Sequence, residues 1–535
     1  MKRFLVMALA AFAFAACSEK EESGNAIQNG ELEQSYVAIT IAADDMGTRA
    51  DDGGYEDGRE EESRVHSAYV FFFKNGAPFH VNLSSNTTTN SGAHNYLEID
   101  LSADDTQYGT TTDNVTDIKE KVLVIQNYKG EYPNQMVAVL NWTPTEDDYE
   151  LIDLQTAVTA LGNDANGYVM SNSVYLVTNN GNNTATIMDY TPLTEDFIFQ
   201  KEADAMDHPV QIYVERVAAK VEYTATNNGS FNTGVEVDGT PIYAHIQSFE
   251  LYNDYEQSYL LKHISKDWNE NEIGFAWNNP AWFRSYWATS LGVGYEFPEN
   301  TFNWNNDNTA LNGYNYLGEN TRAWTVADDV RTKVIVKALL GDEEGHAIEV
   351  VNWYGKNYVG EDNLKIVVAN TLNRLYWSST DGANFVGLEN SDLKCVARNS
   401  NDPKAYEVYF QLSTNGEGKT WYKHENGVYS PIDDDELNTA LAAVQPALVY
   451  NDGMAYYWLD IEHLGNAGKT AEYGIVRNHV YKVNITGITG LGTPIYDPTQ
   501  DFIVPEKPKD INTFVSAQIN ILSWHVVNGD YILGN

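Results

Sequence analysis

An alternating apolar stretch near the N-terminus is followed directly by a segment that no core strand could contain. Val37, Ile39 and Ile41 alternate with alanine and threonine. Alternation of β-branched residues with period two predicts a β-strand with one buried face. Residues 44–50 are Asp-Asp-Met-Gly-Thr-Arg-Ala, which is typical of an exposed, flexible segment. We therefore predict a strand that is apolar enough to pack in a hydrophobic core, followed by a protease cleavage site at Arg49. We expect the strand to be displaced after proteolysis.

The first residues have the order of a bacterial lipoprotein leader. Two basic residues precede the apolar residues 4–14, which are too few to cross a membrane as a helix, and Ala15-Ala16-Cys17 follows. This order predicts a signal peptide over residues 1–16, its removal by lipoprotein signal peptidase, acylation of Cys17 with chains such as palmitate, and anchoring to the outer membrane through the lipid. The alternative is a plain secretory peptide that is cut after Ala15 or Ala16.

Length and composition indicate an all-β protein with more than one domain. The chain has 535 residues, with 35 Tyr and 12 Trp, and one hydrophobic core rarely serves so many residues. Strand-forming segments recur at short spacing, and the pattern fails after residue 262. We predict two β-sandwich domains in tandem, transthyretin-like or Greek-key, with a few short helices. Residues 17–49 would be a propeptide, 50–265 the N-terminal domain and 266–535 the C-terminal domain.

Four segments carry local predictions. Residues 151–161 have helical apolar spacing and precede Gly162, which predicts a helix with a C-cap glycine. Residues 436–444 follow three aspartates and predict a second short helix. Residues 362–368 are interpreted as a strand. The acidic, glycine-containing residues 51–64 are interpreted as an exposed, mobile linker.

The charge balance and the cysteine count exclude several classes of function. With 76 acidic and 33 basic residues, the net charge of −43 would repel nucleic acid and anionic lipid surfaces. Once Cys17 is acylated, Cys395 is the one remaining cysteine, so neither an internal disulfide nor a multi-cysteine metal site can form. Cys395 is predicted to be a buried, small apolar residue.

No sequence pattern indicates an enzyme. The sequence has no nucleophile elbow, phosphate-binding loop or metal motif, so we predict no catalytic residue, no metal and no cofactor. Arg477-Asn478-His479 is interpreted as the start of a strand, and residues 433–436 as a helix cap and not a calcium site. Residues 305–308 lack the spacing and the closing glutamate of an EF-hand. The many Trp and Tyr residues are predicted to pack in cores and on strand faces, with a glycan-binding platform as the alternative.

Four segments near the C-terminus form a recognisable series, at residues 456–463, 473–481, 488–494 and 519–524. This series resembles the C-terminal signature of the fimbrillins of Bacteroidales, the subunits of type V pili, and is most similar to the major subunit of the short fimbriae. Residues 170–173, residues 216–221 and the leader also stand in the order found in that family.

The resemblance implies a mode of maturation and assembly. A fimbrillin is exported as a lipoprotein, an Arg-specific surface protease removes its first strand, and the C-terminal strand of a neighbouring copy fills the groove. In this chain the displaced strand would be the alternating one at residues 37–41, and the cut would fall between Arg49 and Ala50, with Arg59 and Arg64 as competing sites. The exchange is β-strand addition, in which main-chain hydrogen bonds give affinity and alternating pockets set the register.

The end of the chain provides the predicted donor strand. Asn528-Gly529 is a turn signal that divides it into a longer strand and a short tail. A vacated groove needs apolar residues at every second position. The candidates for insertion are Val526, Val527, Tyr531, Ile532 and Leu533. Val527, Tyr531 and Leu533 share one parity, whereas Val526 and Ile532 share the other with Trp524, and both parities stay open.

Two classes of function follow. The first is the structural major subunit of a cell-surface fimbrium, which would polymerise with itself, meet anchor and tip accessory subunits, and support adhesion and virulence at the outer membrane. The second is a non-polymerising surface adhesin or glycan-binding module, or a tip or anchor subunit of the same fimbria. The receptor is unknown in both cases.

Overall fold

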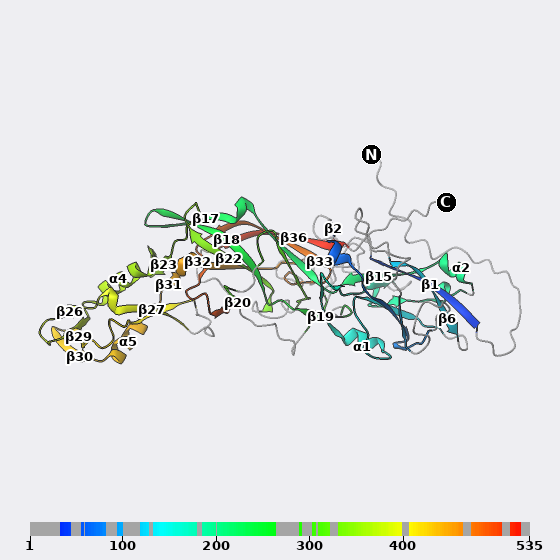
Figure 1. The fold of residues 1–535 in the computed structure, drawn as a ribbon, viewed down its shortest axis with the longest axis horizontal. Helices are drawn as coiled ribbons and strands as arrows, with labels where there is room; N and C mark the ends of the chain where they lie inside the picture. The colour runs from blue at the N-terminus through cyan, green and yellow to red at the C-terminus, as the bar shows by residue number, and fades with distance from the viewer. Residues whose placement is uncertain are drawn as a thin grey trace.

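A computed structural model describes residues 33–43, 55–57, 59–81, 94–99, 118–127, 132–178, 185–199, 201–263, 288–291, 302–305, 309–321, 330–398, 406–463, 472–504 and 514–525. The molecule is elongated, with an N-terminal sheet towards one end and a smaller module at the other (Figure 1). Its secondary structure is mainly β-strand with a few short helices, so the all-β prediction is confirmed. None of the helices described is long and apolar enough to span a membrane.

The N-terminal sheet contains nine strands and holds the first described strand in its interior. The strands are β1 (Glu33–Ala43), β3 (Ala68–Lys74), β4 (Ala77–Pro78), β5 (Tyr96–Glu98), β6 (Ile118–Asn127), β7 (Gln135–Leu140), β11 (Met170–Asn172), β14 (Thr191–Pro192) and β15 (Val210–Arg216). Their hydrogen-bonded order is β4-β3-β7-β11-β15-β1-β6, with β5 against β3 and β14 against β7. β1 is the strand that the alternation at residues 37–41 predicts, and this prediction is confirmed.

Apolar side chains cover both faces of the N-terminal sheet. Along β3, Val70 and Phe72 belong to one hydrophobic cluster, whereas Phe71 and Phe73 belong to another. Successive side chains of a strand point to opposite faces, so a run of consecutive apolar residues suits a strand that is buried on both sides.

Two five-stranded sheets face each other as a β-sandwich. The first has the order β2-β36-β33-β16-β21, with β2 (Tyr55–Asp57), β36 (Phe514–His525), β33 (His479–Thr489), β16 (Ala219–Ala225) and β21 (Tyr314–Leu317). The second has the order β17-β18-β22-β32-β34, with β17 (Ser230–Val237), β18 (Thr240–Tyr252), β22 (Lys333–Gly341), β32 (Met454–Asp460) and β34 (Thr493–Pro494). One hydrophobic cluster joins them, in which Tyr223 stacks on Phe249 with ring centroids 4.7 Å apart.

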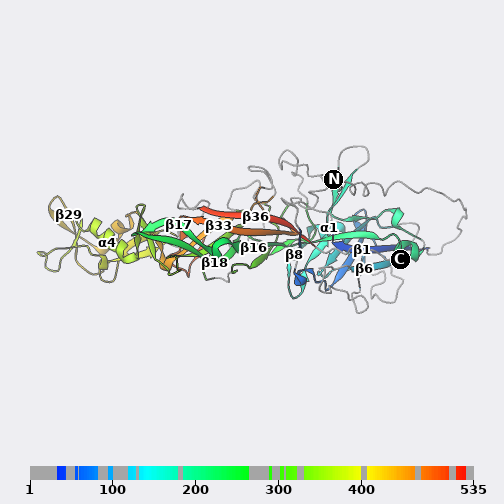
Figure 2. The same ribbon diagram turned by 90° about the horizontal axis from the view of Figure 1, so that it is seen from above.

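Residues 350–450 form a compact unit, the end module, between β22 and β32 of the sandwich. It contains β23 (Val350–Trp353), β24 (Lys356–Val359), α4 (Glu361–Leu372), β25 (Tyr376–Ser378), β26 (Val386–Gly387), β27 (Leu393–Ala397), β28 (Val408–Leu412), β29 (Trp421–Glu425), β30 (Val428–Ile432), α5 (Asp434–Ala442) and β31 (Leu448–Tyr450). Its core includes Leu364, Phe410, Trp421 and Leu437. Both views place α4 and β29 near the end of the molecule that is remote from the N-terminal sheet (Figures 1 and 2).

The remaining described elements are short connections. They are β8 (Val158–Ala160), β9 (Gly162–Asn163), β10 (Gly167–Tyr168), β12 (Tyr175–Thr178), β13 (Ala185–Met188), β19 (Gln257–Tyr259), β20 (Phe302–Asn303), β35 (Asp501–Phe502), α1 (Leu151–Thr156), α2 (Glu202–Met206), and the 3-10 helices η1 (Glu60–Ser63), η2 (Glu195–Phe197), η3 (Thr226–Gly229), η7 (Asn390–Asp392) and η8 (Asn451–Gly453).

Two of the local predictions need correction and one is confirmed. The predicted strand at residues 362–368 is wrong, because Leu364 and Val368 are buried one helical turn apart on α4 and acidic residues stabilise its first turn. The predicted helix over residues 151–161 stops at Thr156, since residues 158–160 pair with β19 instead. The short helix after the three aspartates is present as α5, and the side chain of Asp433 caps it.

The pairing of strands bears on the division into domains. β16 and β18 precede residue 265, yet they hydrogen-bond with strands that follow it, and β17 joins the same sheet through β18. The boundary at residue 265 stays a prediction. Because β15 belongs to one sheet and β16 to another, we propose a boundary at Val217-Ala218.

Candidate functional site

β1 separates two other strands of the N-terminal sheet. It pairs in parallel with β15, where Ile39 lies opposite Val210 and Ile41 opposite Ile212. It pairs antiparallel with β6, where Val37 lies opposite Leu123. Loss of β1 would leave unpaired main-chain groups on the facing edges of both neighbours, and such edges readily accept another strand.

The chain that follows β1 belongs to the other half of the molecule. β2 lies at the edge of a sandwich sheet and runs parallel to β36, with Tyr55 opposite Ser523 and Asp57 opposite His525. The predicted cut at Arg49-Ala50 thus lies between a segment of the N-terminal sheet and a segment of the sandwich, although residues 44–54 are themselves outside the described part of the chain.

The side chain of Arg59 is held by three separate parts of the chain. Its Nη2 donates to Asp164 Oδ1 at 2.9 Å and to the hydroxyl of Tyr316 at 2.5 Å, and its Nε donates to Glu62 Oε1 at 3.0 Å. The guanidinium carbon also lies 4.4 Å from the ring centroid of Tyr314, a cation–π contact. An Arg-specific protease binds this side chain in its own pocket, so cutting at Arg59 would require all of these contacts to break.

Glu62 is the buried centre of this arrangement. Its Oε1 lies 3.1 Å from Lys220 Nζ and accepts a hydrogen bond from the hydroxyl of Tyr316 at 2.5 Å, while Arg216 Nε donates to the Glu62 carbonyl at 2.8 Å. Burial raises the pKa of the Glu62 carboxyl, but the Tyr316 hydrogen bond and the charge of Lys220 outweigh that effect, and the pKa lies below its ordinary value of 4.5. Glu62 is therefore held as a carboxylate.

Arg64 is protected through its backbone. The Asn141 side chain spans the bond after it, because Nδ2 donates to the Arg64 carbonyl at 2.7 Å and Oδ1 accepts from the His66 amide at 2.7 Å. Val65, between them, is buried. Residues 59–66 are therefore docked, and the prediction of an exposed, mobile linker is wrong for the segment around Arg59 and Glu62, whereas the side chain of Arg64 is exposed as predicted. The segment is held by contacts with residues that are distant in the sequence, namely Asp164, Lys220 and Tyr316.

One family model matches the C-terminal region. Residues 448–530 match the family described as major fimbrial subunit protein type IV, fimbrillin, C-terminal. The region resembles a fimbrillin C-terminus. No curated protein matches the chain. Among solved structures, a fimbrilin from Porphyromonas gingivalis has a TM-score of 0.37 at 12% identity over 92% of this chain and 98% of that one. The tip fimbrial protein of the same organism, with C-terminal truncation, has a TM-score of 0.29 at 13% identity over 92% and 100%.

The fimbrillin match covers β31 to β36 and extends past the end of β36 at His525. It therefore includes Val526 and Val527 of the predicted donor strand. The other donor candidates, Tyr531, Ile532 and Leu533, follow it. All five, together with Cys17, Arg49 and Ala50, lie outside the described residues, so their predicted roles stay predictions.

Arg477, which lies within the fimbrillin match, is buried and held by hydrogen bonds. Its side chain is fully buried, and Nη2 lies 2.7 Å from Glu319 Oε2 and donates to the carbonyl of Tyr259 at 2.7 Å. His479 is also buried, and its ring nitrogen Nδ1 lies 2.7 Å from the carbonyl of Arg477. Burial lowers the pKa of His479 to about 4, so its imidazole is neutral at physiological pH. These contacts agree with the interpretation of this tripeptide as the start of a strand.

Cys395 and one acidic turn contain atoms of the kinds that bind metal ions. Cys395 is buried in the core of the end module, as predicted, and burial raises its pKa well above the ordinary value. Among the described residues, the ligand atoms of Asp342, Glu344 and His346 lie within 4.8 Å of one another. This group sits on a turn and is largely exposed, and Asp342 hydrogen-bonds the backbone and ring of His346. These turn contacts account for the cluster without an ion.

Proposed function

We propose that this protein is a shaft-type subunit of a cell-surface fimbria that polymerises by strand exchange after proteolytic removal of β1. The observation that carries the proposal is the position of β1 between β15 and β6, and the sequence adds Arg49, the predicted cut site, shortly after β1. The fimbrillin match over residues 448–530 supports the assignment to a fimbria. The lipoprotein leader ending at Cys17 would bring the precursor to the outer membrane.

The way in which the folded protein holds Arg59 and Arg64 favours Arg49 as the site of maturation. Arg59 is held by its side chain and Arg64 by its backbone, so a protease would have to unfold either site first. A cut after Arg59 or Arg64 would also remove β2, which pairs with β36. A cut between Arg49 and Ala50 removes β1 alone and leaves β2 joined to the sandwich.

The groove left by β1 would select the donor strand. Val210 and Ile212 of β15 are buried in the hydrophobic core, at the positions that lie opposite Ile39 and Ile41. A replacement strand needs apolar side chains at the same alternating positions, and the end of the chain offers them in either parity. Burying three such side chains would contribute roughly 5–9 kcal/mol before the cost of ordering the strand.

The test combines proteolysis with assembly. Purified precursor is treated with limiting trypsin, sequenced from its new N-terminus, and analysed for ladders on unboiled gels and for fibres by negative-stain microscopy. We expect a start at Ala50 and assembly into ladders. Arg49→Ala should block both, whereas Arg64→Ala, the matched control, should block neither.

Deletion of residues 526–535 separates the donor from the acceptor. The variant should be cleaved and stay folded by circular dichroism but form no ladder. Ladders from the deleted protein would contradict the donor assignment. A start after Arg59 or Arg64 would contradict the cut site, and cleavage at Arg49 without any assembly would favour a tip, anchor or non-polymerising adhesin role.

A further inference from the structure

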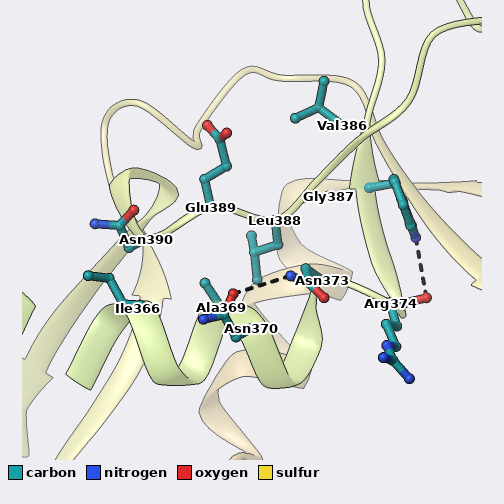
Figure 3. Close-up of a pocket in the computed structure, with 11 residues that line it drawn as sticks. Ile366, Ala369, Asn370, Asn373, Arg374, Val386, Gly387, Leu388, Glu389 and Asn390 are labelled. Carbon is teal, nitrogen blue, oxygen red and sulfur yellow. Dashed lines mark hydrogen bonds between the residues drawn. The ribbon is translucent and has the colours of Figure 1, made fainter. Parts of the chain in front are cut away.

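The end module contains an open pocket on the side of α4. The pocket has a volume of about 440 Å³, which falls in the range of small-molecule sites. Its wall is built from the C-terminal half of α4, the start of β25 and the segment from β26 to η7 (Figure 3). The lining side chains that can hydrogen-bond are Asn370, Asn373, Arg374, Trp377, Glu389 and Asn390.

The pocket wall is held in place by close packing and local hydrogen bonds. Gly387 allows β26 to approach the end of α4, because a Cβ there would lie 2.9 Å from the carbonyl oxygen of Asn373. Trp377 Nε1 donates to the carbonyl of Arg374 at 3.2 Å, and its ring meets Tyr429 edge-on with centroids 5.8 Å apart. The indole is therefore fixed in orientation while it stays half-buried. A fixed, partly exposed ring can offer a face to a ligand at little entropic cost.

Half of the six polar side chains that line the pocket are amides. A side-chain amide carries two donors and an acceptor, so the asparagines around the pocket can satisfy hydroxyl groups, which also donate and accept. One long hydrogen bond joins two of them, from Asn373 Nδ2 to Asn370 Oδ1 at 3.5 Å. Figure 3 shows Asn390 and Glu389 on one side of the pocket and Asn370, Asn373 and Arg374 on the other. One arginine and one glutamate leave the rim without a large net charge.

The end module carries most of the exposed large apolar side chains of the described residues. Among the described residues, seven large hydrophobic side chains are exposed, and all except Ile152 lie in the end module. Two of them, Ile366 at 43% and Val386 at 53% exposed, line the pocket itself. These two side chains give a ligand in the pocket an apolar surface to contact.

We propose that this pocket binds a neutral saccharide. A sugar ring has one apolar C–H face, which suits Trp377, Ile366 and Val386, and a rim of hydroxyl groups, which suits the three asparagines. An anionic polymer is disfavoured by the net charge of −43 on the chain. An apolar peptide anchor would leave the polar groups of the rim unpaired, which weakens binding. The site lies far from β1, and none of its lining residues belongs to the proposed strand exchange, so the proposal does not depend on polymerisation (Figure 1).

The test uses the purified full-length chain on an array of neutral oligosaccharides of glucose, galactose, mannose and N-acetylglucosamine, followed by calorimetric titration with the best binder. Arg374→Ala and Asn390→Ala should each lower the affinity about tenfold, as the loss of one or two hydrogen bonds implies. Trp377→Ala should lower it further. Tyr354→Ala removes an aromatic ring that is 72% exposed in the same module but outside the pocket, and it should leave the affinity unchanged.

Thermal unfolding of each variant separates loss of the site from loss of the fold, and the exposed Arg374 gives a variant that keeps the core intact. The proposal is overturned if no neutral saccharide binds, or if Arg374→Ala and Asn390→Ala, while folded, bind as well as the parent. It is also overturned if Tyr354→Ala weakens binding as much as they do, since the apolar surface as a whole would then be responsible.

Discussion

β1 and residues 55–66 are neighbours in the sequence but are held in different ways. β1 joins the N-terminal sheet through main-chain pairing with β15 and β6, with one shift of register against β6 between Ile39 and Ile41. The later segment has only the three residues of β2 in a sheet and is fixed mainly by side chains: Arg59 and Glu62 with their ionic partners, and Asn141 across the bond after Arg64.

The difference shows how one chain can combine a replaceable part with a permanent one. Main-chain pairing accepts any strand of suitable alternation, so one strand can take the place of another. A network of specific buried charges accepts only its own partners, because an unpaired buried charge is very unfavourable. A cut between the two segments would release the first and leave the second in place.

The largest expected effect comes from removal of Glu62. Glu62→Ala removes the buried carboxylate that pairs with Lys220 and accepts from Tyr316, although Arg216 can still donate to the backbone carbonyl at position 62 and Lys220 keeps its pair with Glu222. Removing one partner of a buried ion pair typically costs about 3–5 kcal/mol. Residues 55–66 should detach, exchange their amide hydrogens rapidly and be cut by trypsin after Arg59 and Arg64. Hydrogen exchange with mass spectrometry measures the change.

Glu61→Ala is the matched control for this variant. Glu61 forms pairs of 3.7 Å with Arg59 and Arg64 at a partly exposed position, and such pairs contribute about 0–1 kcal/mol. Equal exchange in the two variants would mean that the segment is not held by the buried charges.

The sequence predicted the strand and missed the network, for physical reasons. Alternation is a local property, and residues 37–41 display it completely, so β1 was predictable. The network joins Arg59 and Glu62 to Asp164, Lys220 and Tyr316, and nothing in an acidic, glycine-containing segment indicates which distant residues it meets. The same limit applies to the end module, where residues 362–368 are apolar enough for a strand but form a helix.

The second prediction concerns β1. The alternation predicts that Ile41 faces the core, so Ile41→Ala should destabilise the precursor by about 2–5 kcal/mol. After cleavage at Arg49 and removal of the released peptide, the parent and the variant should have identical denaturation midpoints, because the altered residue is gone. A difference that persists in the cleaved form would show that β1 had not left. Thr40→Ala, on the opposite parity of the strand, is the control.

The third prediction tests the backbone clamp at Arg64. Asn141→Ala removes hydrogen bonds to the Arg64 carbonyl, the His66 amide and the Tyr168 carbonyl, with an expected loss of about 1–3 kcal/mol. The bond after Arg64 should become a second site for limiting trypsin, as N-terminal sequencing would reveal. Asn141→Asp retains the acceptor for His66 but not the donors, so it should be cut at an intermediate rate. Unchanged protection in both variants would contradict the clamp.

The smallest expected effect is a response to acid. The pKa of Glu62 lies below its ordinary value of 4.5, because the Tyr316 hydrogen bond and the charge of Lys220 outweigh burial. The pKa of Asp164 is also lowered, since hydrogen bonds from Arg59 and Tyr168 outweigh its own burial. A carboxyl whose pKa falls on folding stabilises the folded state fully above its unfolded pKa, and this stabilisation is lost as the pH drops through the folded value.

Residues 55–66 should therefore exchange faster as the pH falls below about 4.5, after correction for the intrinsic rate. Residues 37–41 of β1 carry no titratable side chain and should respond less.

Glu62→Gln imitates the protonated carboxyl, so at neutral pH the variant should exchange as the parent does in acid. Its pH response should shrink to the part that Asp164 supplies. The effect should be smaller than that of Glu62→Ala, because the amide can still accept the hydrogen bond from Tyr316. An acid response of Glu62→Gln as steep as that of the parent would mean that another group controls the docking of this segment.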